Sequence, residues 1–453
     1  MRLAFLKQWY GYFSKDELKK FFIALVIFGC ILAAYWALRP IKDGIFQDLV
    51  GRSSQPFAKI LSLLIVFPLV IIYTKLLDIF PRHRMFYILC PIYAVGTLIF
   101  AYLFSHPALG LSNIQEFVCQ GAVERQHLLP MGRLIGWAWY VFVESYGSLV
   151  VALFWGFMAD ITTPESARRG FPLIALGQWG TILGPLIGKM LLDFYHSTVP
   201  TIIFAACVII TIMPLIFLFM RCVPAEQMVG YQAKNHAEKK EVPGFFEGLK
   251  LVFTTPYLFS ILTLITLYEA VVTVLDFRFK WLAGGLYQGS DLCSYLSSYA
   301  IWVGVISMLC VVLGVNNIQR RLGIKISLIL LPLLVAAALI VFAYAPILPI
   351  AFCIMVATKA FNYALNAPTM HQLYIPTTRE AKYKAKGWID TFGGRFSKAF
   401  GSSVNIASLS VAPSLFLPLG AMLAVGSIGV WLWIAIYLAT TYNKAIARND
   451  VVC

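Results

Sequence analysis

Ionisable side chains interrupt several long apolar stretches of this 453-residue sequence. A charge at bilayer depth is costly unless it faces a cavity or a partner, so such residues mark ion pairs, proton relays or sites for a charged ligand. Clusters also close the first stretch and the seventh. The positions are Glu144, Lys189, Asp193, Glu269, Lys359, Asp390, Arg395 and Lys398, with Lys42 and Asp43 ending the first stretch and Asp276, Arg278 and Lys280 ending the seventh.

A cationic helix face is predicted near the C-terminus. Arg395 and Lys398 are three residues apart and therefore share one side of a helix, near Gly394 and Gly401. The glycines leave room for an anion beside the two cations. Arginine offers paired donors that match a phosphate, and lysine adds a compact charge. We interpret this face, together with Lys42, as a candidate phosphate site.

The remaining charges divide by depth. Glu144 and Lys398 lie deep in apolar or small-residue stretches, which favours function over a structural ion pair. Glu144 and Glu269 could pair with the cations or carry protons, and Lys359 and Asp390 are further substrate-binding candidates. Near predicted helix ends we expect internal ion pairs or snorkelling side chains, namely at Lys189, Asp193, Arg278 and Lys280.

Aromatic residues near these charges could stack on a nucleobase. Tyr146, Phe154 and Trp155 share a stretch with Glu144. Packing is the more common role of any one aromatic side chain in a membrane helix. Of these aromatic residues we retain Tyr146 as a substrate-binding candidate.

Other chemistry finds little support. The Gly188–Lys189 pair lacks the spacing and the following Ser or Thr of a phosphate-binding loop, so any nucleotide is expected as cargo. The nine cysteines form no CxxC pair, and the six histidines lie mostly in predicted loops. No nucleophile, base and orienting group come together. We therefore expect a protein that is not an enzyme and that needs no metal and no cofactor.

Composition indicates a membrane protein. Hydrophobic residues make up 60% of the chain and charged residues 13%, against roughly 25% charged residues in soluble domains. The length accommodates about twelve membrane-spanning helices. We predict spans at 18–39, 57–79, 84–105, 132–160, 169–194, 199–221, 256–282, 292–316, 323–345, 347–375, 384–411 and 414–442.

The placement of Lys and Arg predicts the orientation. Basic residues gather in alternate loops and in the C-terminal tail, for example at Arg168, Arg169 and Lys382, which is the positive-inside pattern. Both termini are therefore expected in the cytoplasm. The same placement argues against nucleic acid as the partner of a chain with net charge +15. We expect the lipid bilayer as its surroundings, and a monomer.

The chain divides into two similar halves. A polar linker at 222–255 separates residues 1–221 from residues 256–453, each with six predicted spans. The segments 161–180 and 375–394 share residues in register, including Ile161 with Ile375 and Gly180 with Gly394. Two parallel six-helix repeats define an all-α membrane protein of the major-facilitator plan, whose substrate site lies between the halves.

Four glycines in the fifth span serve packing. Gly177, Gly180, Gly184 and Gly188 recur at steps of three and four residues, so they form one small helix face. Such a face allows two helices to approach closely. We interpret it as structural.

Several motifs, in order along almost the whole chain, resemble the nucleotide transporter family, the ATP/ADP translocases of obligate intracellular bacteria and plastids. The resemblance implies transport of ATP against ADP, or nucleotide uptake with protons, across a bacterial inner membrane. It also implies roles for Lys42, Glu144, Glu269 and Lys398. The motifs are Leu38–Asp43, Val143–Ser148 with Phe154–Phe157, Ala167–Leu173, Leu267–Glu269, Tyr374–Pro376, Lys386–Gly387 with Ile389–Asp390, and Ser397–Lys398 with Gly401.

Two departures from the family pattern keep the cargo open. Met370 and His371 stand where energy-exchanging members usually have a Lys-Glu pair, and Ala399 and Phe400 follow Lys398 in place of a Ser-Gly-Gly-like run. Another nucleotide, or another anionic metabolite carried by the same fold, is therefore an alternative cargo. A membrane-bound enzyme or a lipid-handling protein is the third interpretation.

Overall fold

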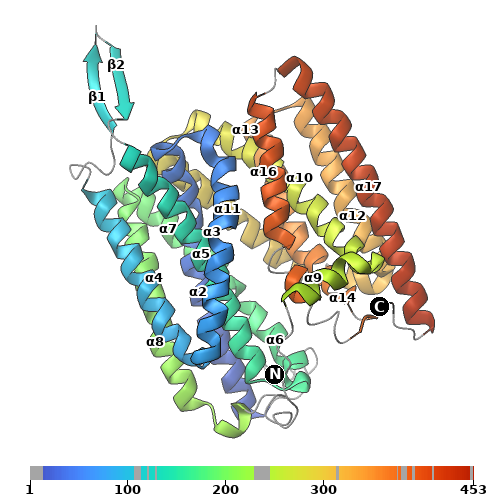
Figure 1. Ribbon diagram of the computed structural model, residues 1–453. Coiled ribbons are helices and arrows are strands. Elements are labelled where there is room, and N and C mark those ends of the chain that lie inside the picture. The colour runs from blue at the N-terminus through green and yellow to red at the C-terminus, as the bar shows by residue number, and fades with distance from the viewer. Residues whose placement is uncertain are drawn as a thin grey trace. The chain divides into compact units, whose positions relative to one another are not determined.

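The chain folds almost entirely into helices (Figure 1). The computed structural model describes residues 14–106, 114–119, 122–127, 130–228, 245–312, 316–374, 376–378, 385–389, 393–410, 413–448 and 452. Up to the linker the α-helices are α2 (Lys15–Leu49), α3 (Gln55–Ile79), α4 (Arg82–Ser105), α5 (Pro130–Asp160), α6 (Pro164–Ala175), α7 (Gly180–Tyr195) and α8 (Val199–Cys222).

The α-helices after the linker are α9 (Phe245–Thr254), α10 (Pro256–Leu286), α11 (Gly289–Val312), α12 (Asn316–Tyr344), α13 (Leu348–Phe361), α14 (Ala367–Gln372), α15 (Lys386–Trp388), α16 (Gly394–Ser410) and α17 (Pro413–Arg448). A π-helical segment, Asn362–Asn366, joins α13 to α14. A two-stranded antiparallel hairpin, β1 (Ile114–Cys119) with β2 (Ala122–His127), was not predicted from the sequence.

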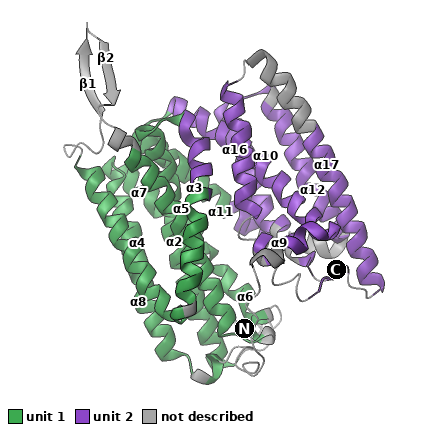
Figure 2. Ribbon diagram, in the orientation of Figure 1, with its two compact units in different colours: residues 1–52, 64–240, 287–304 green, residues 53–63, 241–286, 305–453 purple. Residues whose placement is uncertain are grey.

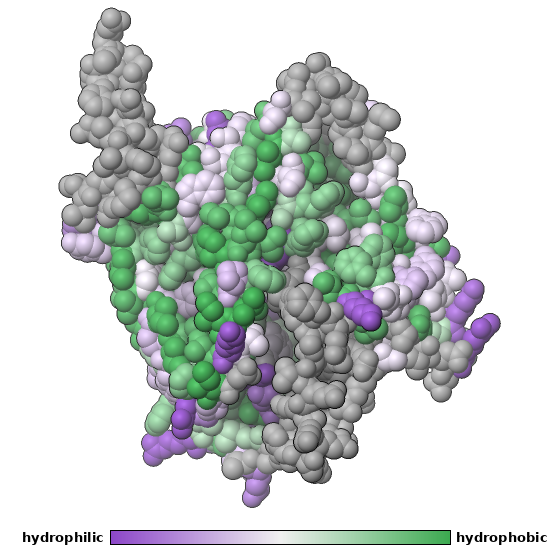
Figure 3. Space-filling model, in the orientation of Figure 1, coloured by the Kyte–Doolittle hydropathy of each residue, from purple (hydrophilic) through white to green (hydrophobic). Residues whose placement is uncertain are grey.

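The helices have the length and composition of membrane spans. Within the described residues, ten helical segments are long and apolar enough to cross a bilayer, and each coincides with a predicted span. The segment Arg52–Leu77 shows where lipid must lie, because only 11% of its most apolar window is buried although its mean hydropathy there is 2.4. Figure 3 shows hydrophobic side chains spread over the visible face. The chain is therefore a multi-pass membrane protein.

Two compact units make up the chain (Figure 2). Unit 1 consists of residues 1–52, 64–240 and 287–304, and unit 2 consists of residues 53–63, 241–286 and 305–453. Two helices, α3 and α11, are thus divided between the units. The predicted halves 1–221 and 256–453 are a separate, sequence-based division, which stays a prediction.

The first helix is longer than its predicted span. The polar group Lys42–Asp43 was expected to end that span near residue 39, yet α2 continues to Leu49. Both side chains are buried, with relative exposures of 2% and 3%. The prediction assumed that Lys42 and Asp43 face water at the end of the span. In the structure they form ion pairs within the protein, and the helix continues past them.

The predicted fifth span is a composite. It consists of α6, a 3₁₀ turn at Leu176–Trp179, and α7. The glycine face packs closely on another helix, as predicted, and the structure shows that this helix is α2. A Cβ atom at Gly180 would lie 2.1 Å from the carbonyl oxygen of Gly29, and one at Gly184 would lie 2.2 Å from that of Ala33. Only hydrogen fits at these positions, so the two helices pack backbone to backbone.

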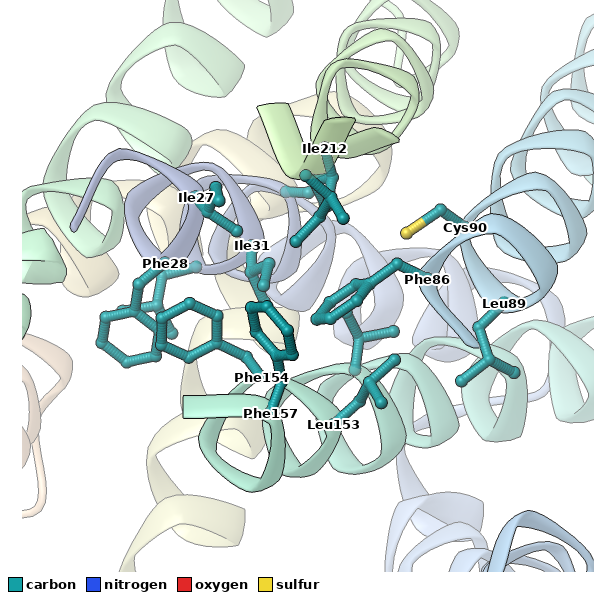
Figure 4. Close-up of a cluster of buried hydrophobic side chains, with 14 of the residues drawn as sticks. Ile27, Phe28, Ile31, Phe86, Leu89, Cys90, Leu153, Phe154, Phe157 and Ile212 are labelled. Atoms are coloured by element: carbon teal, nitrogen blue, oxygen red, sulfur yellow. The ribbon is translucent and has the colours of Figure 1, made fainter. Parts of the chain in front are cut away.

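One core cluster of unit 1 is aromatic and aliphatic, and α2, α4, α5 and α8 contribute most of its residues (Figure 4). Phe28 from α2 stacks on Phe154 from α5 at 5.0 Å between ring centroids, and Phe86 from α4 meets Phe157 at 5.9 Å. Ile212 from α8 completes this cluster. The cluster fixes α2 against α5, the two helices that carry Lys42 and Glu144.

In unit 2, α10 packs against α13, α16 and α17. A Cβ atom at Gly401 of α16 would lie 2.7 Å from the carbonyl oxygen of Ala270, so α16 approaches the backbone of α10 closely. The amide of Asn405 donates a hydrogen bond to the carbonyl of Thr273, at 3.3 Å. These contacts, at Ala270 and Thr273, hold α16 in register with α10 over the turn that follows Glu269.

Candidate transport site in the membrane helices

The first candidate pair joins α2 to α5. The ammonium of Lys42 donates a hydrogen bond to Oε1 of Glu144 and lies 3.5 Å from Oδ1 of Asp43. It also lies 4.0 Å from the centre of the Tyr140 ring, within range of a cation–π contact. The Lys42 side chain is 3% exposed and that of Glu144 is 30% exposed. In this pair the Glu144 carboxylate is therefore the more accessible group, and the Lys42 ammonium is the buried one.

Local helix geometry explains this arrangement. Tyr140 and Glu144 are four residues apart, so they occupy the same face of α5 and surround the ammonium together. A Cβ atom at Gly147, one turn further along, would lie 2.3 Å from the Tyr35 ring of α2. Glycine is thus required for α5 to approach α2 near the Lys42–Glu144 contact.

The second candidate pair joins α10 to α16. Nζ of Lys398 lies 3.9 Å from Oε2 of Glu269, with side-chain exposures of 49% and 26%. The neighbouring Ser397 is buried and lies 3.0 Å from the hydroxyl of Thr266, a hydrogen bond that fixes this turn of α16. Arg395 is half-buried on the same helix. This pair is looser and more accessible than the first.

A third charged cluster has Asp276 at its centre. One Asp276 oxygen, Oδ2, accepts hydrogen bonds from Lys280 at 2.8 Å and Lys59 at 3.1 Å. Lys359 lies 3.7 Å from the other oxygen. The carboxylate is only 7% exposed. Three helices, α3, α10 and α13, thus share one buried acid.

Sequence reasoning missed the centre of this cluster. Asp276 and Lys280 were interpreted as the end of the seventh span, and Lys59 was not singled out. The signal for Lys59 was weak, because a lysine in the first turn of a span is ordinary after a polar loop. Asp276 was named with Lys280, but its contacts with Lys59 and Lys359 could not be predicted, because these two lysines lie far away in the sequence.

The other candidates have different positions. Tyr146 is 1% exposed, and its hydroxyl lies 3.3 Å from the carbonyl oxygen of Ile31, so we assign it to packing. Lys359 contacts Asp276. Met370 is buried. Asp390 lies outside the described residues, as does the side chain of His371.

Lys189 and Asp193 form the expected ion pair near the end of α7, with 2.8 Å between Nζ and Oδ2. Lys280 likewise has its carboxylate partner four residues earlier on the same helix. Both contacts agree with the structural role predicted for charges near span ends.

Two charged pairs join spans that correspond in the predicted repeat. Lys42 and Glu144 join the predicted first and fourth spans, and Asp276 and Lys359 join the predicted seventh and tenth spans. The register that aligns Ile161 with Ile375 places Glu144 opposite Thr358, next to Lys359, but places Lys42 opposite Pro256 rather than Asp276. The correspondence therefore concerns the spans and the position of Glu144, with the acid and the base exchanged.

Polytopic helices with paired charges at membrane depth define a secondary carrier of the major-facilitator fold, and solved structures share that fold. A bacterial homologue of the iron transporter ferroportin, in its inward-facing state, aligns with TM-score 0.57 at 11% identity, covering 94% of this chain and 98% of that one. The peptide-transporter-family protein PepTSo gives 0.57 at 15% identity, with 95% and 99% covered. At such identities the likeness concerns the fold alone.

The family follows from the sequence comparison. A profile described as TLC ATP/ADP transporter matches residues 5–352, so the chain belongs to this family. ADP,ATP carrier protein 1 of Chlamydia muridarum is 26% identical over 485 residues, covering 96% of this chain and 90% of the relative. ADP,ATP carrier protein 4 of Rickettsia felis is 25% identical over 447 residues, with 88% and 86% covered.

Proposed function

We propose that this chain moves a nucleotide across a bacterial inner membrane by alternating access, either exchanging ATP for ADP or taking up nucleotide together with protons. Family membership and fold support the class of activity. The observation that carries the proposal is the recurrence of a base–acid contact between two membrane helices, at Lys42–Glu144 and at Lys398–Glu269. Neither contact is needed to build a helix bundle, and burial of the Lys42 ammonium costs free energy.

The two pairs suit a polyanionic cargo. A phosphate brings oxygens that can replace a carboxylate at each ammonium, with charge-assisted hydrogen bonds of similar strength. When cargo leaves, Glu144 pairs with Lys42 again and Glu269 with Lys398, so neither lysine is left buried without a counter-charge. The carboxylates thus act as placeholders for phosphate, and protonation of either acid is the point at which uptake could couple to protons.

The cations differ in the order in which cargo meets them. Lys398 is about half exposed and loosely held, and Arg395 lies one turn away on the same helix. We assign first contact with phosphate to these two residues. Lys42 is almost fully buried. We therefore assign to it a later contact with phosphate, which forms only once the cargo is bound. Lys359 and Asp390 complete the set of candidates.

The chain is proposed to lie in the membrane with both termini in the cytoplasm. Residues 1–221 and 256–453 are then the two halves that rock about the cargo, with 222–255 as a cytoplasmic linker. The lysines and arginines of alternate loops support this orientation.

Uptake measurements test the proposal. Cells or vesicles containing the chain would receive labelled ATP, ADP, GTP or other nucleotides, with and without internal ADP. Uptake stimulated by internal ADP indicates exchange, and uptake that requires a proton gradient indicates symport. Vesicles with the Lys42→Ala/Lys398→Ala variant at equal protein amount serve as the control. Absence of transport for every nucleotide would refute the proposal.

A second candidate cargo is another anionic metabolite. It is favoured by Met370 and His371, which replace the Lys-Glu pair of energy-exchanging relatives. Competition against one labelled nucleotide separates the candidates. Inhibition by nucleotides at micromolar concentration supports the first, and inhibition by a non-nucleotide anion alone supports the second.

A further inference from the structure

The N-terminal parts of α3 and α11 belong to different compact units from the C-terminal parts of the same helices (Figure 2). Residues 53–63, at the beginning of α3, group with α10 and α13 in unit 2, and residues 287–304, at the beginning of α11, group with α2 and α7 in unit 1. Each beginning follows a loop that the basic residues place on the non-cytoplasmic side. Both units therefore contain a helix start from the other predicted half, on the same side of the membrane.

The start of α3 is held by Lys59. Its ammonium donates a hydrogen bond to Asp276 at 3.1 Å, and the two side chains are 15% and 7% exposed. Further along, α3 has little buried surface, since only 11% of its most apolar window is buried. The contact with Asp276 therefore helps to fix the beginning of this helix.

Asp276 keeps other cations when Lys59 is removed. Lys280 donates to the same oxygen at 2.8 Å, and Lys359 lies 3.7 Å from the other oxygen. Breaking a buried ion pair is costly chiefly because one charge is left without a partner. Here Asp276 keeps Lys280 and Lys359, so the buried acid is not left without a counter-charge when the Lys59 contact breaks.

The start of α11 is held in the same manner. The hydroxyl of Ser294 donates to Asp193 at 2.6 Å and accepts from Lys189 at 2.7 Å, while Lys189 and Asp193 also bond to each other. When Ser294 leaves, the pair on α7 retains its own contact. The backbone amide of Gly289 adds a hydrogen bond to Asp48 of α2, at 3.2 Å.

We propose that Lys59 and Ser294 are positioning residues for transport, whose contacts close the non-cytoplasmic side and break each time the carrier opens there. They hold helix starts rather than cargo. Their partners, Asp276 and the Lys189–Asp193 pair, keep other ionic contacts when these two side chains move away. This inference rests on the proposed alternating access and on the predicted orientation. It deepens that function by assigning which contacts must open.

Cys293 provides a native reporter of this opening. Its side chain is fully buried, next to Ser294, and its sulfur lies 2.2 Å from where a Cβ atom at Gly44 would be. A membrane-impermeant maleimide can reach it from outside only when α11 separates from α2. The experiment uses the full chain in intact cells, with every other cysteine replaced by serine, and measures the labelling rate of Cys293.

Removing the charge at Lys59 should favour the open state. We expect Lys59→Met to raise the labelling rate several-fold and to lower the maximal uptake rate more than it changes KM. Lys59→Arg, which restores a cation, should return both values toward those of the parent. Lys75→Met, at the exposed far end of the same helix, is the matched control and should change neither.

Cross-linking supplies a second measurement. In an Asp193→Cys/Ser294→Cys variant of a background without other cysteines, a short bifunctional thiol reagent should stop uptake, and a cleavable form of the reagent should restore it after reduction. Labelling of Cys293 that does not respond to Lys59→Met, or labelling from the cytoplasmic side alone, would overturn the inference. Uptake by the parent background is measured in parallel, so failure of the proposed function is recognised separately.

Discussion

Lys42 is a cation kept away from solvent by groups of its own chain. Glu144 and Asp43 supply negative charge, and the Tyr140 ring covers the ammonium from the third side. At 30% exposure Glu144 is more accessible than Lys42. Under the proposed function it is the group that an anionic cargo would displace from Lys42.

Removal of Lys42 alone should affect both folding and transport. Lys42→Met leaves Glu144 without its cation, and we expect a loss of stability of about 3 kcal/mol, the lower end for breaking a buried pair, because Glu144 is partly exposed. The double variant Lys42→Met/Glu144→Gln should regain most of that stability and no transport. Thermal unfolding of the purified protein and nucleotide uptake measure the two effects. Recovery of uptake in the double variant would contradict a role in cargo binding.

Lys398 should behave differently because it is half exposed. Exposed ion pairs contribute roughly 0–1 kcal/mol, so Lys398→Ala should leave the unfolding temperature of the empty protein nearly unchanged. The rise in unfolding temperature on adding ATP should be lost. Differential scanning fluorimetry with and without ATP measures this, with Lys250→Ala, an exposed lysine on α9, as control. An undiminished ATP response in Lys398→Ala would exclude Lys398 from the site.

The sequence identified single charges better than their contacts. Lys42, Glu144, Glu269 and Lys398 could be selected because a charge inside an apolar stretch demands an explanation. Their pairing was not predictable from spacing, since Lys42 and Glu144 are 102 positions apart. Tyr146 was selected as an aromatic residue beside a candidate acid; its side chain is buried and contacts the carbonyl of Ile31, so its role in binding stays a prediction.

Helix α7 is fixed to α2 by glycine. At Gly177, Gly180 and Gly184 a Cβ atom would lie within 3 Å of a backbone oxygen of α2, and backbone cannot move aside as a flexible side chain can. The two helices can therefore slide along each other only over a short distance. It requires hydrogen at each of these positions.

Gly184→Ala should force α2 and α7 apart. We expect a loss of about 1–3 kcal/mol, typical of overpacking, and a matching fall in transport. Gly429→Ala is the control, since α17 has nothing within 4 Å of a Cβ atom there, and alanine should be neutral or stabilising by up to about 1 kcal/mol. Unfolding temperatures of the purified variants make the comparison. Equal stabilities of the two variants would show that the α2–α7 contact can relax.

Boundaries were the weakest part of the prediction at this scale. Apolar length gave the position of the spans, while the end of α2 was placed ten residues early because Lys42 and Asp43 were assumed to face water. The 3₁₀ turn at Leu176–Trp179 and the π-helical segment at Asn362–Asn366 were not predicted. Such local changes of helical pitch depend on packing between helices, which a single helical pattern does not contain.

At the scale of the whole molecule, two ion pairs join corresponding predicted spans, with the acid and the base on opposite members of the pair. A first-to-fourth-span pair has its base on α2, and the corresponding seventh-to-tenth-span pair has its acid on α10. The fold class was predictable because composition and the internal repeat are properties of the entire chain. The β1–β2 hairpin was not, because a span count gives no information about what a connecting segment forms.

Exchange of ATP for ADP transfers about one net charge per cycle, so membrane potential should bias it. One charge moved across 100 mV corresponds to roughly 2.3 kcal/mol, or about fifty-fold in the equilibrium distribution. Vesicles loaded with ADP and clamped with potassium and valinomycin would show accumulation of ATP that follows the potential. Accumulation that follows the proton gradient and ignores the clamped potential would instead establish symport.

The backbone contact between α2 and α7 means that these two helices move together. Lys42 lies on α2. Lys189 and Asp193 lie near the C-terminal end of α7, in contact with Ser294 of α11. Two helices joined without intervening side chains shift together. If cargo binds at Lys42 as proposed, the displacement of α2 would therefore be transmitted through the glycine contact to α7 and to the start of α11.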